Sequence, residues 1–203
     1  MRKFIFIIVI AVFLLTSCDS PVVPQAYTNS DTACSLGNTL YQSIGDYVCW
    51  NPEWTDVRTG LCFDPLCDHK GTESMCPENT WLWNKTIITD GKKLYLNVQN
   101  AAMTDINNTM YRQIYSMNPD GSGFSLLHTY DASGATSPVM QYSDGYLYYE
   151  QGHYRTEHLT NTSNTNHDDQ YMTIMRIPIE GGNTEIVFDN EMDMITKFFV
   201  DDQ

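Results

Sequence analysis

Three cysteines and a histidine lie close together in the sequence and could hold a metal ion. Cys62, Cys67, His69 and Cys76 follow the spacing Cys-x4-Cys-x-His-x6-Cys. Three thiolates and an imidazole form a complete tetrahedral ligand set for zinc, which accepts such soft and borderline donors. Because protein atoms would fill all four positions, we expect a structural site. An open position, which catalysis would need, is not indicated.

The same cysteines allow other states. Paired ligands in common zinc fingers usually lie two to four residues apart, and cysteines of exported proteins more often form disulfides. Free thiols in a reducing niche are a third alternative. The sequence has six cysteines. If Cys18 is modified and three others hold a metal, Cys34 and Cys49 remain as a possible disulfide, whereas a scheme of disulfides alone leaves one thiol over.

The start of the chain indicates export and a lipid anchor. A basic pair, an apolar run over residues 4–15 and two small residues precede Cys18. The apolar run is shorter than the roughly 20 residues that a membrane-spanning helix needs. Residues 15–18 (LTSC) resemble the lipobox of bacterial lipoproteins, in which the cysteine is acylated and becomes the mature N-terminus. This resemblance implies a signal peptide over residues 1–17 and a palmitate-type acyl anchor on Cys18. Two acyl chains on one residue hold a protein stably at a membrane.

The anchor would place the domain on the extracytoplasmic face of the cell membrane, with residues 18–30 as lipidated N-terminus and spacer. The alternative is a secretory signal with a coincidental cysteine. The formal net charge is −14, with 25 acidic and 11 basic residues. Such a surface disfavours nucleic acid, since affinity for phosphates depends on Lys and Arg. The expected partners are the bilayer, through Cys18, and a protein, peptide or glycan.

The remaining sequence predicts a nearly all-β domain over residues 31–203. Short alternating runs bounded by Asp, Asn and Gly dominate it. Residues 87–98 (IITDGKKLYLNV) and 140–151 (MQYSDGYLYYEQ) both indicate tight hairpins around Asp-Gly. A second hairpin follows each, over residues 113–131 and 172–189. The pattern therefore predicts four strands per unit.

A four-stranded unit that recurs about every 50 residues is typical of a β-propeller blade. We expect blades at about 40–80, 81–136 and 137–196 and the start of a fourth at 197–203. Closing a propeller takes roughly four to eight blades. The expectation is therefore a partial propeller, from a truncated copy or a fragment of a longer protein. An open β-sandwich is the alternative.

The units resemble TolB-like and low-density-lipoprotein-receptor-like six-bladed propellers, in which a phrase such as NPDGSG (residues 118–123) forms the turn between the outer strands. Residues 59–77 resemble a group of lipoproteins from anaerobic Firmicutes, in which a short cysteine and histidine motif closes the first blade. The resemblance implies a surface lipoprotein that binds or scaffolds. Fold alone leaves function open.

Other segments favour plain structural roles. Asn118, Asp120 and Ser122 mimic half of a calcium loop, but Thr129 stands where a bidentate carboxylate is needed, so we expect a β-turn. Residues 158–169 indicate a polar loop, and Trp81 and Trp83 alternate as in a strand, where one side chain enters the core. No catalytic residues are predicted. The alternatives to a binding module are a fragment of a propeller hydrolase or lyase and a nonfunctional truncated copy.

Overall fold

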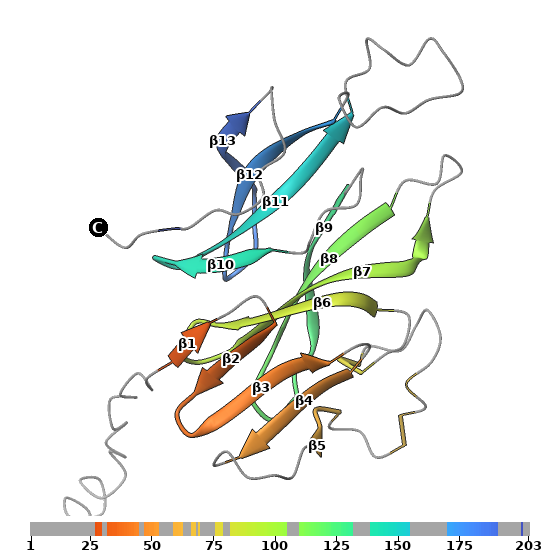
Figure 1. Cartoon of the computed structure of the whole chain (residues 1–203), viewed down its shortest axis with the longest axis vertical. Helices are drawn as coiled ribbons and strands as arrows, with labels where there is room; N and C mark the ends of the chain where they lie inside the picture. The colour runs from red at the N-terminus through yellow and green to blue at the C-terminus, as the bar shows by residue number, and fades with distance from the viewer. Residues whose placement is uncertain are drawn as a thin grey trace, which may run out of the picture.

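The computed structural model describes residues 27–29, 32–44, 47–52, 59–62, 66–67, 69, 76–78, 82–104, 110–131, 139–154, 170–190 and 200. All regular structure in these ranges is β-strand, arranged as three antiparallel sheets (Figure 1). The all-β prediction is confirmed. The predicted signal peptide, the predicted acylation site Cys18 and, apart from Val200, the expected start of a fourth blade at 197–203 lie outside the described residues.

Each sheet is a meander whose strands follow chain order. Sheet A contains β1 (Tyr27–Asn29), β2 (Ala33–Leu36), β3 (Thr39–Ile44), β4 (Tyr47–Pro52) and β5 (Thr59–Gly60). Sheet B contains β6 (Leu82–Thr89), β7 (Leu94–Thr104), β8 (Met110–Met117) and β9 (Ser125–Asp131). Sheet C contains β10 (Met140–Ser143), β11 (Tyr146–Tyr154), β12 (Gln170–Pro178) and β13 (Glu185–Asn190).

The two units read from the Asp-Gly hairpins are therefore four-stranded sheets, as predicted. The first unit differs from the expectation. Sheet A has five strands and begins at Tyr27, inside the segment interpreted as a spacer. Its first two strands carry no Asp-Gly turn, so the repeat pattern did not reveal them.

The two Asp-Gly sites form different turns. Asp144 and Gly145 both have positive φ, and Ser143 pairs with Tyr146, as in a two-residue type I′ hairpin. At the other site Thr89 pairs with Leu94, which leaves a four-residue loop. There Asp90 Oδ1 accepts the backbone N–H groups of Lys92 and Lys93 at 2.8 and 2.7 Å. An aspartate side chain thus shapes a longer turn than the tight one expected.

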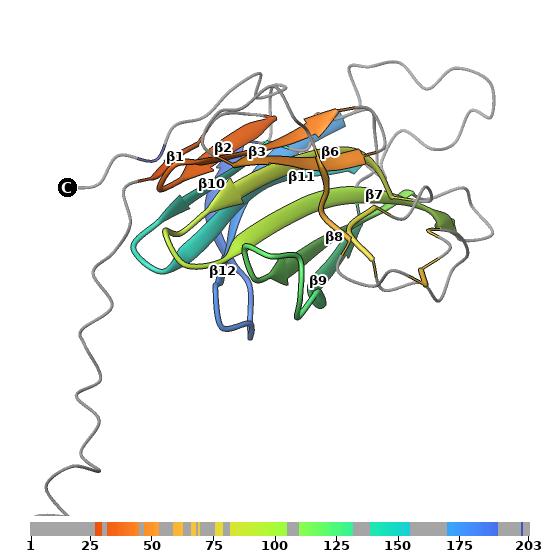
Figure 2. The ribbon, with the colours of Figure 1, turned by 90° about the horizontal axis from the view of Figure 1, so that it is seen from below.

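The sheets follow one another along the long axis of the molecule (Figure 1). Strand β6 contacts β1, β2 and β3 of sheet A on one side and β10 of sheet C on the other, and β9 contacts β11. Seen from below, sheet A lies above sheet B (Figure 2). Sheet B is therefore the middle element, and its two faces form two separate interfaces, which we name the A–B and the B–C interface.

Candidate metal centre

The fold brings together the four residues singled out by their spacing. One ligand atom each from Cys62, Cys67, His69 and Cys76 lies within 4.8 Å of every other. His69 Nδ1 is 3.4 Å from Cys76 Sγ. Cys76 is buried and the other three are half-buried. The cluster follows strand β5 and precedes strand β6, so it lies at the connection between sheets A and B.

These distances fit a four-coordinate ion. With Zn–S bonds of about 2.3 Å and Zn–N bonds of about 2.0 Å, a tetrahedral centre separates its ligand atoms by roughly 3.5 to 4 Å. The observed spread is compatible with that size after small side-chain shifts. The set of three sulfurs and one imidazole nitrogen suits zinc better than calcium or magnesium, which prefer oxygen. The described residues therefore form a group that could bind a metal, with all four positions filled by protein.

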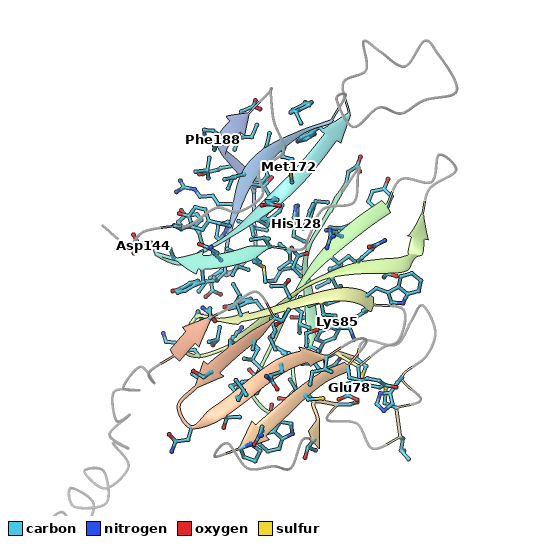
Figure 3. All side chains as sticks on the ribbon, in the orientation of Figure 1. Glu78, Lys85, His128, Asp144, Met172 and Phe188 are labelled. Carbon is cyan, nitrogen blue, oxygen red and sulfur yellow. The ribbon has the colours of Figure 1, made fainter. Side chains whose placement is uncertain are left out.

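Hydrogen bonds hold the Cys76 end of the cluster. The backbone N–H of Glu78 donates to Cys76 Sγ at 3.4 Å. Lys85 Nζ, from the buried part of β6, donates to the Pro77 carbonyl at 3.0 Å. Glu78 and Lys85 both carry labels in Figure 3, near the end of sheet A and on β6 respectively. The turn over residues 76–78 is thereby fastened to sheet B.

The Glu78 side chain links the same turn to sheet A. Its carboxylate is packed so tightly over Gly60 that a Cβ added there would overlap Oε1 of Glu78. Only 7 % of Glu78 is exposed, and Oε1 accepts no hydrogen bond in the described part of the structure. A buried carboxylate in this position requires a glycine at residue 60.

A second close approach ties the cluster to the turn between β8 and β9. A Cβ added to Gly121 would overlap the carbonyl oxygen of Leu61, the residue before Cys62. Gly121 has a φ of 84°, in the left-handed region that favours glycine. Leu61 itself is buried in the core and donates its N–H to the Val48 carbonyl at 3.0 Å. The backbone that carries Cys62 is therefore fixed from both sheets.

Burial, the largest cause, raises the pKa of Cys76 well above its usual range, and neighbouring Cys62 and Cys67 add to the rise. Three thiols this close cannot all ionise unless a cation compensates the charge. Metal binding deprotonates such thiols and releases protons. Burial thus keeps the Cys76 thiol neutral without a metal, and a bound metal would hold it as a thiolate.

The geometry argues against the possible disulfide between Cys34 and Cys49. Strand β3 lies between them, since Cys34 pairs with Tyr41 and Cys49 pairs with Gln42. Adjacent residues of a strand face opposite sides, and strands two apart are roughly 10 Å from each other. A disulfide needs Cα atoms within about 7 Å and facing side chains. Burial also raises the pKa of the Cys34 thiol to about 12.

Other segments weighed from the sequence have structural roles where they are described. Residues 118–123 form the predicted turn, with Gly121 N–H donating to the Asn118 carbonyl at 2.9 Å. Ser122 donates from its N–H and its hydroxyl to Asp120 Oδ1, which satisfies that oxygen within the turn. Trp83 is 48 % exposed beside the buried Leu82. Trp81 and residues 158–169 lie outside the described residues.

Comparison of the sequence with models of known protein families finds no match, and comparison with curated proteins finds no relative. None of the described residues forms a helix with the length and hydropathy that crossing a bilayer would take. The geometry of the cluster is therefore the main guide to function.

Sequence reasoning missed the residues that support the cluster. Lys85 lies in a strand and belongs to no motif, and Gly60 and Gly121 are two of 12 glycines. Glu78 stands two residues after a ligand, where a backbone N–H often donates to a metal-bound sulfur, and that spacing is the one signal that could have pointed to it. The other contacts arise from residues far apart in the chain.

Proposed function

We propose that this chain is a lipid-anchored, extracytoplasmic binding or scaffolding module whose A–B interface is held by a structural zinc ion. Cys62, Cys67, His69 and Cys76 are the ligands. The single observation that carries the zinc proposal is the mutual approach of their four ligand atoms within 4.8 Å. The zinc would cross-link the end of sheet A to the start of sheet B. Such a link stabilises a small β-domain because the unfolded chain lacks the site.

The β-propeller interpretation belongs to the same proposal. Three successive antiparallel meanders, packed in chain order, are what consecutive blades would look like. Hydrogen bonds between side chains and the backbone link segments that lie far apart in the chain. Asn29 of β1 bonds both the N–H and the carbonyl of Thr89 on β6, at 2.9 and 3.0 Å. Val200 donates its N–H to Gln141 Oε1 on β10 at 2.8 Å.

An exposed apolar strand supports a binding role. Ile186, Val187 and Phe188 are 61, 49 and 50 % exposed on β13, the last strand in the order of sheet C (Figure 3). A strand at the edge of a sheet offers backbone groups with which an extended segment of another protein can pair. Ligand contact through this edge needs no catalytic group, and we assign none.

Metal analysis with thiol counting on anaerobically purified protein tests the zinc proposal. We expect one zinc per chain, lost when Cys62, Cys67 or Cys76 is replaced by Ser. Cys34→Ser is the matched control for Cys76→Ser, because Cys34 is as buried as Cys76 and lies outside the cluster. Thiols released only by a reductant, with no metal present, would instead establish disulfides in the cluster and contradict the proposal.

The anchor is tested by labelling with a radioactive or clickable palmitate. The wild-type chain should incorporate the label and fractionate with membranes. Cys18→Ser should abolish both, while Cys34→Ser should leave both intact. Membrane association of Cys18→Ser without label would show that another feature holds the protein at the membrane.

A further inference from the structure

A pocket of about 440 Å³ opens beside the candidate metal centre. Tyr41 of β3 and Trp50 of β4 form one part of its wall, and Pro119 and Asp120 of the turn between β8 and β9 form another. Cys62 also lines it, so one ligand of the proposed zinc faces both the centre and the pocket. Pockets of roughly 300 to 1,000 Å³ are the size of small-molecule sites.

The wall of the pocket belongs to the packed structure. Tyr41 is 3 % exposed, and Trp50 packs against the apolar core of the A–B interface. The opposite wall is fixed because Gly121, which follows Asp120, packs closely against the Leu61 carbonyl. A site whose walls are set by the fold loses little conformational freedom when a ligand binds.

The charge in the lining of the pocket is negative only. Asp120 is an exposed carboxylate, and Ser122 fixes its direction through hydrogen bonds of 2.9 and 2.7 Å to Oδ1. The other lining residues are Tyr41, Trp50, Thr59, Gly60, Cys62 and Pro119, so no lysine, arginine or histidine lines the described wall. With zinc bound, three thiolates outweigh the ion by one negative charge, and Cys62 carries part of that excess. The pocket therefore repels anions.

We propose that this pocket binds an organic cation, an ammonium group on a small apolar stem. Aromatic faces attract such ions through the ring quadrupole, tryptophan most strongly, and the Asp120 carboxylate adds Coulomb attraction. The net charge of −14 favours the same ligands at longer range. The contribution of Cys62 rests on the proposed zinc centre, whereas those of Trp50 and Asp120 do not.

Choline and its neutral carbon isostere 3,3-dimethylbutan-1-ol test the proposal. Binding is followed by calorimetry or by the indole N–H signals on the full-length chain in a non-ionic detergent. We expect saturable choline binding with a dissociation constant of about 1 mM and at least about tenfold weaker binding of the isostere. Asp120→Asn keeps an oxygen that accepts the hydrogen bonds from Ser122, and it should weaken the binding of choline about fivefold. The matched control is Asp144→Asn, which removes an exposed aspartate from a turn of sheet C (Figure 3) and should change nothing.

Three results would overturn the proposal: equal binding of choline and the isostere, unchanged binding by Asp120→Asn, or no saturable binding of choline and butylamine at about 100 mM. Trp50→Phe, which keeps an aromatic face, should retain binding that Trp50→Leu loses. Zinc content measured in the same samples separates the two proposals. A chain with full zinc that fails to bind choline contradicts the pocket alone.

Discussion

Different kinds of side chain pack against the two faces of sheet B. At the A–B interface the core is mainly aliphatic, with Leu36, Val48 and Leu61 of the sheet A side against Leu94 and Leu96 of β7. The cysteine and histidine cluster closes one side of this interface. At the B–C interface Tyr95, Tyr130 and Tyr149 pack among aliphatic side chains such as Ile88 and Leu147. Buried polar groups also lie there.

Four side chains form the centre of the B–C interface. Tyr130 and Tyr149 have ring centroids 4.5 Å apart, and His128 stacks on Tyr130. Tyr149 Oη and His128 Nε2 are 3.0 Å apart, and the Tyr130 hydroxyl lies within 2.9 and 3.0 Å of the two polar atoms of the Asn97 amide. Buried polar groups of this kind stabilise the folded state only while each of them keeps its hydrogen-bond partner.

Two buried ionisable groups add to the contrast. Arg112 of β8 and Glu150 of β11 are 3 and 4 % exposed, and they interact electrostatically. Burial raises the pKa of Glu150 to about 7, and Arg112 only partly offsets the rise. On the zinc proposal, the A–B interface depends on a removable ion, whereas the B–C interface depends on hydrogen bonds and on the protonation of one carboxyl.

The largest expected loss of stability comes from removing a metal ligand at the A–B interface. Cys76→Ser should lose the zinc and reduce the free energy of unfolding by at least about 5 kcal/mol, because structural zinc supplies folding energy directly. Chemical denaturation with and without a chelator measures it. Cys34→Ser should keep its zinc and its chelator sensitivity. Equal, small losses in both variants would contradict a metal role.

The next prediction compares two glycines of one turn, to distinguish the cost of a steric overlap from the cost of backbone strain. Gly121→Ala places a Cβ on the Leu61 carbonyl at a positive φ and should cost about 4 kcal/mol and weaken zinc binding. Gly123→Ala has a similar φ of 66° but meets only the Asn118 side chain, at 3.2 Å. It should cost about 1 kcal/mol and leave zinc binding unchanged. Thermal unfolding and zinc titration of both variants compare them.

A pH titration tests the B–C interface. Because the folded pKa of Glu150, about 7, lies above the unfolded value near 4.5, the folded state holds the proton more tightly. The free energy of unfolding should therefore fall by about 3 kcal/mol as pH rises from 4.5 to 7. In Glu150→Gln this component should vanish, so that the variant is more stable than wild type at pH 8. Parallel stability curves for the two proteins would refute the assignment.

The smallest effect concerns a single hydroxyl. Tyr130→Phe removes the partner of the fully buried Asn97 amide and should cost about 2 kcal/mol. Tyr149→Phe removes a hydroxyl that faces the half-buried His128, where water can replace it, and should cost about half as much. Denaturation midpoints at one pH compare the pair. A larger loss for Tyr149→Phe would show that the two hydroxyls are ranked wrongly.

The sequence pointed to the residues of the cysteine cluster but not to the contacts between sheets B and C, for a physical reason. The residues of the cysteine cluster lie within 15 consecutive positions. Strands β6 to β13 could be predicted from Asp-Gly turns and alternating aromatic residues. In contrast, Asn97 and Tyr130 are 33 residues apart, and Glu150 reads as an ordinary exposed position of a strand. Side chains that meet only through sheet packing leave no local pattern, and neither did the first two strands of sheet A.

The most direct test of the account is X-ray absorption at the zinc edge of the anaerobically purified chain. We expect a four-coordinate zinc with three sulfur ligands at about 2.3 Å and one nitrogen ligand at about 2.0 Å. In Cys76→Ser the zinc should keep only two sulfur ligands, or the zinc signal should disappear. A chain without zinc, or a zinc shell made only of oxygen and nitrogen, would contradict a metal centre at the A–B interface.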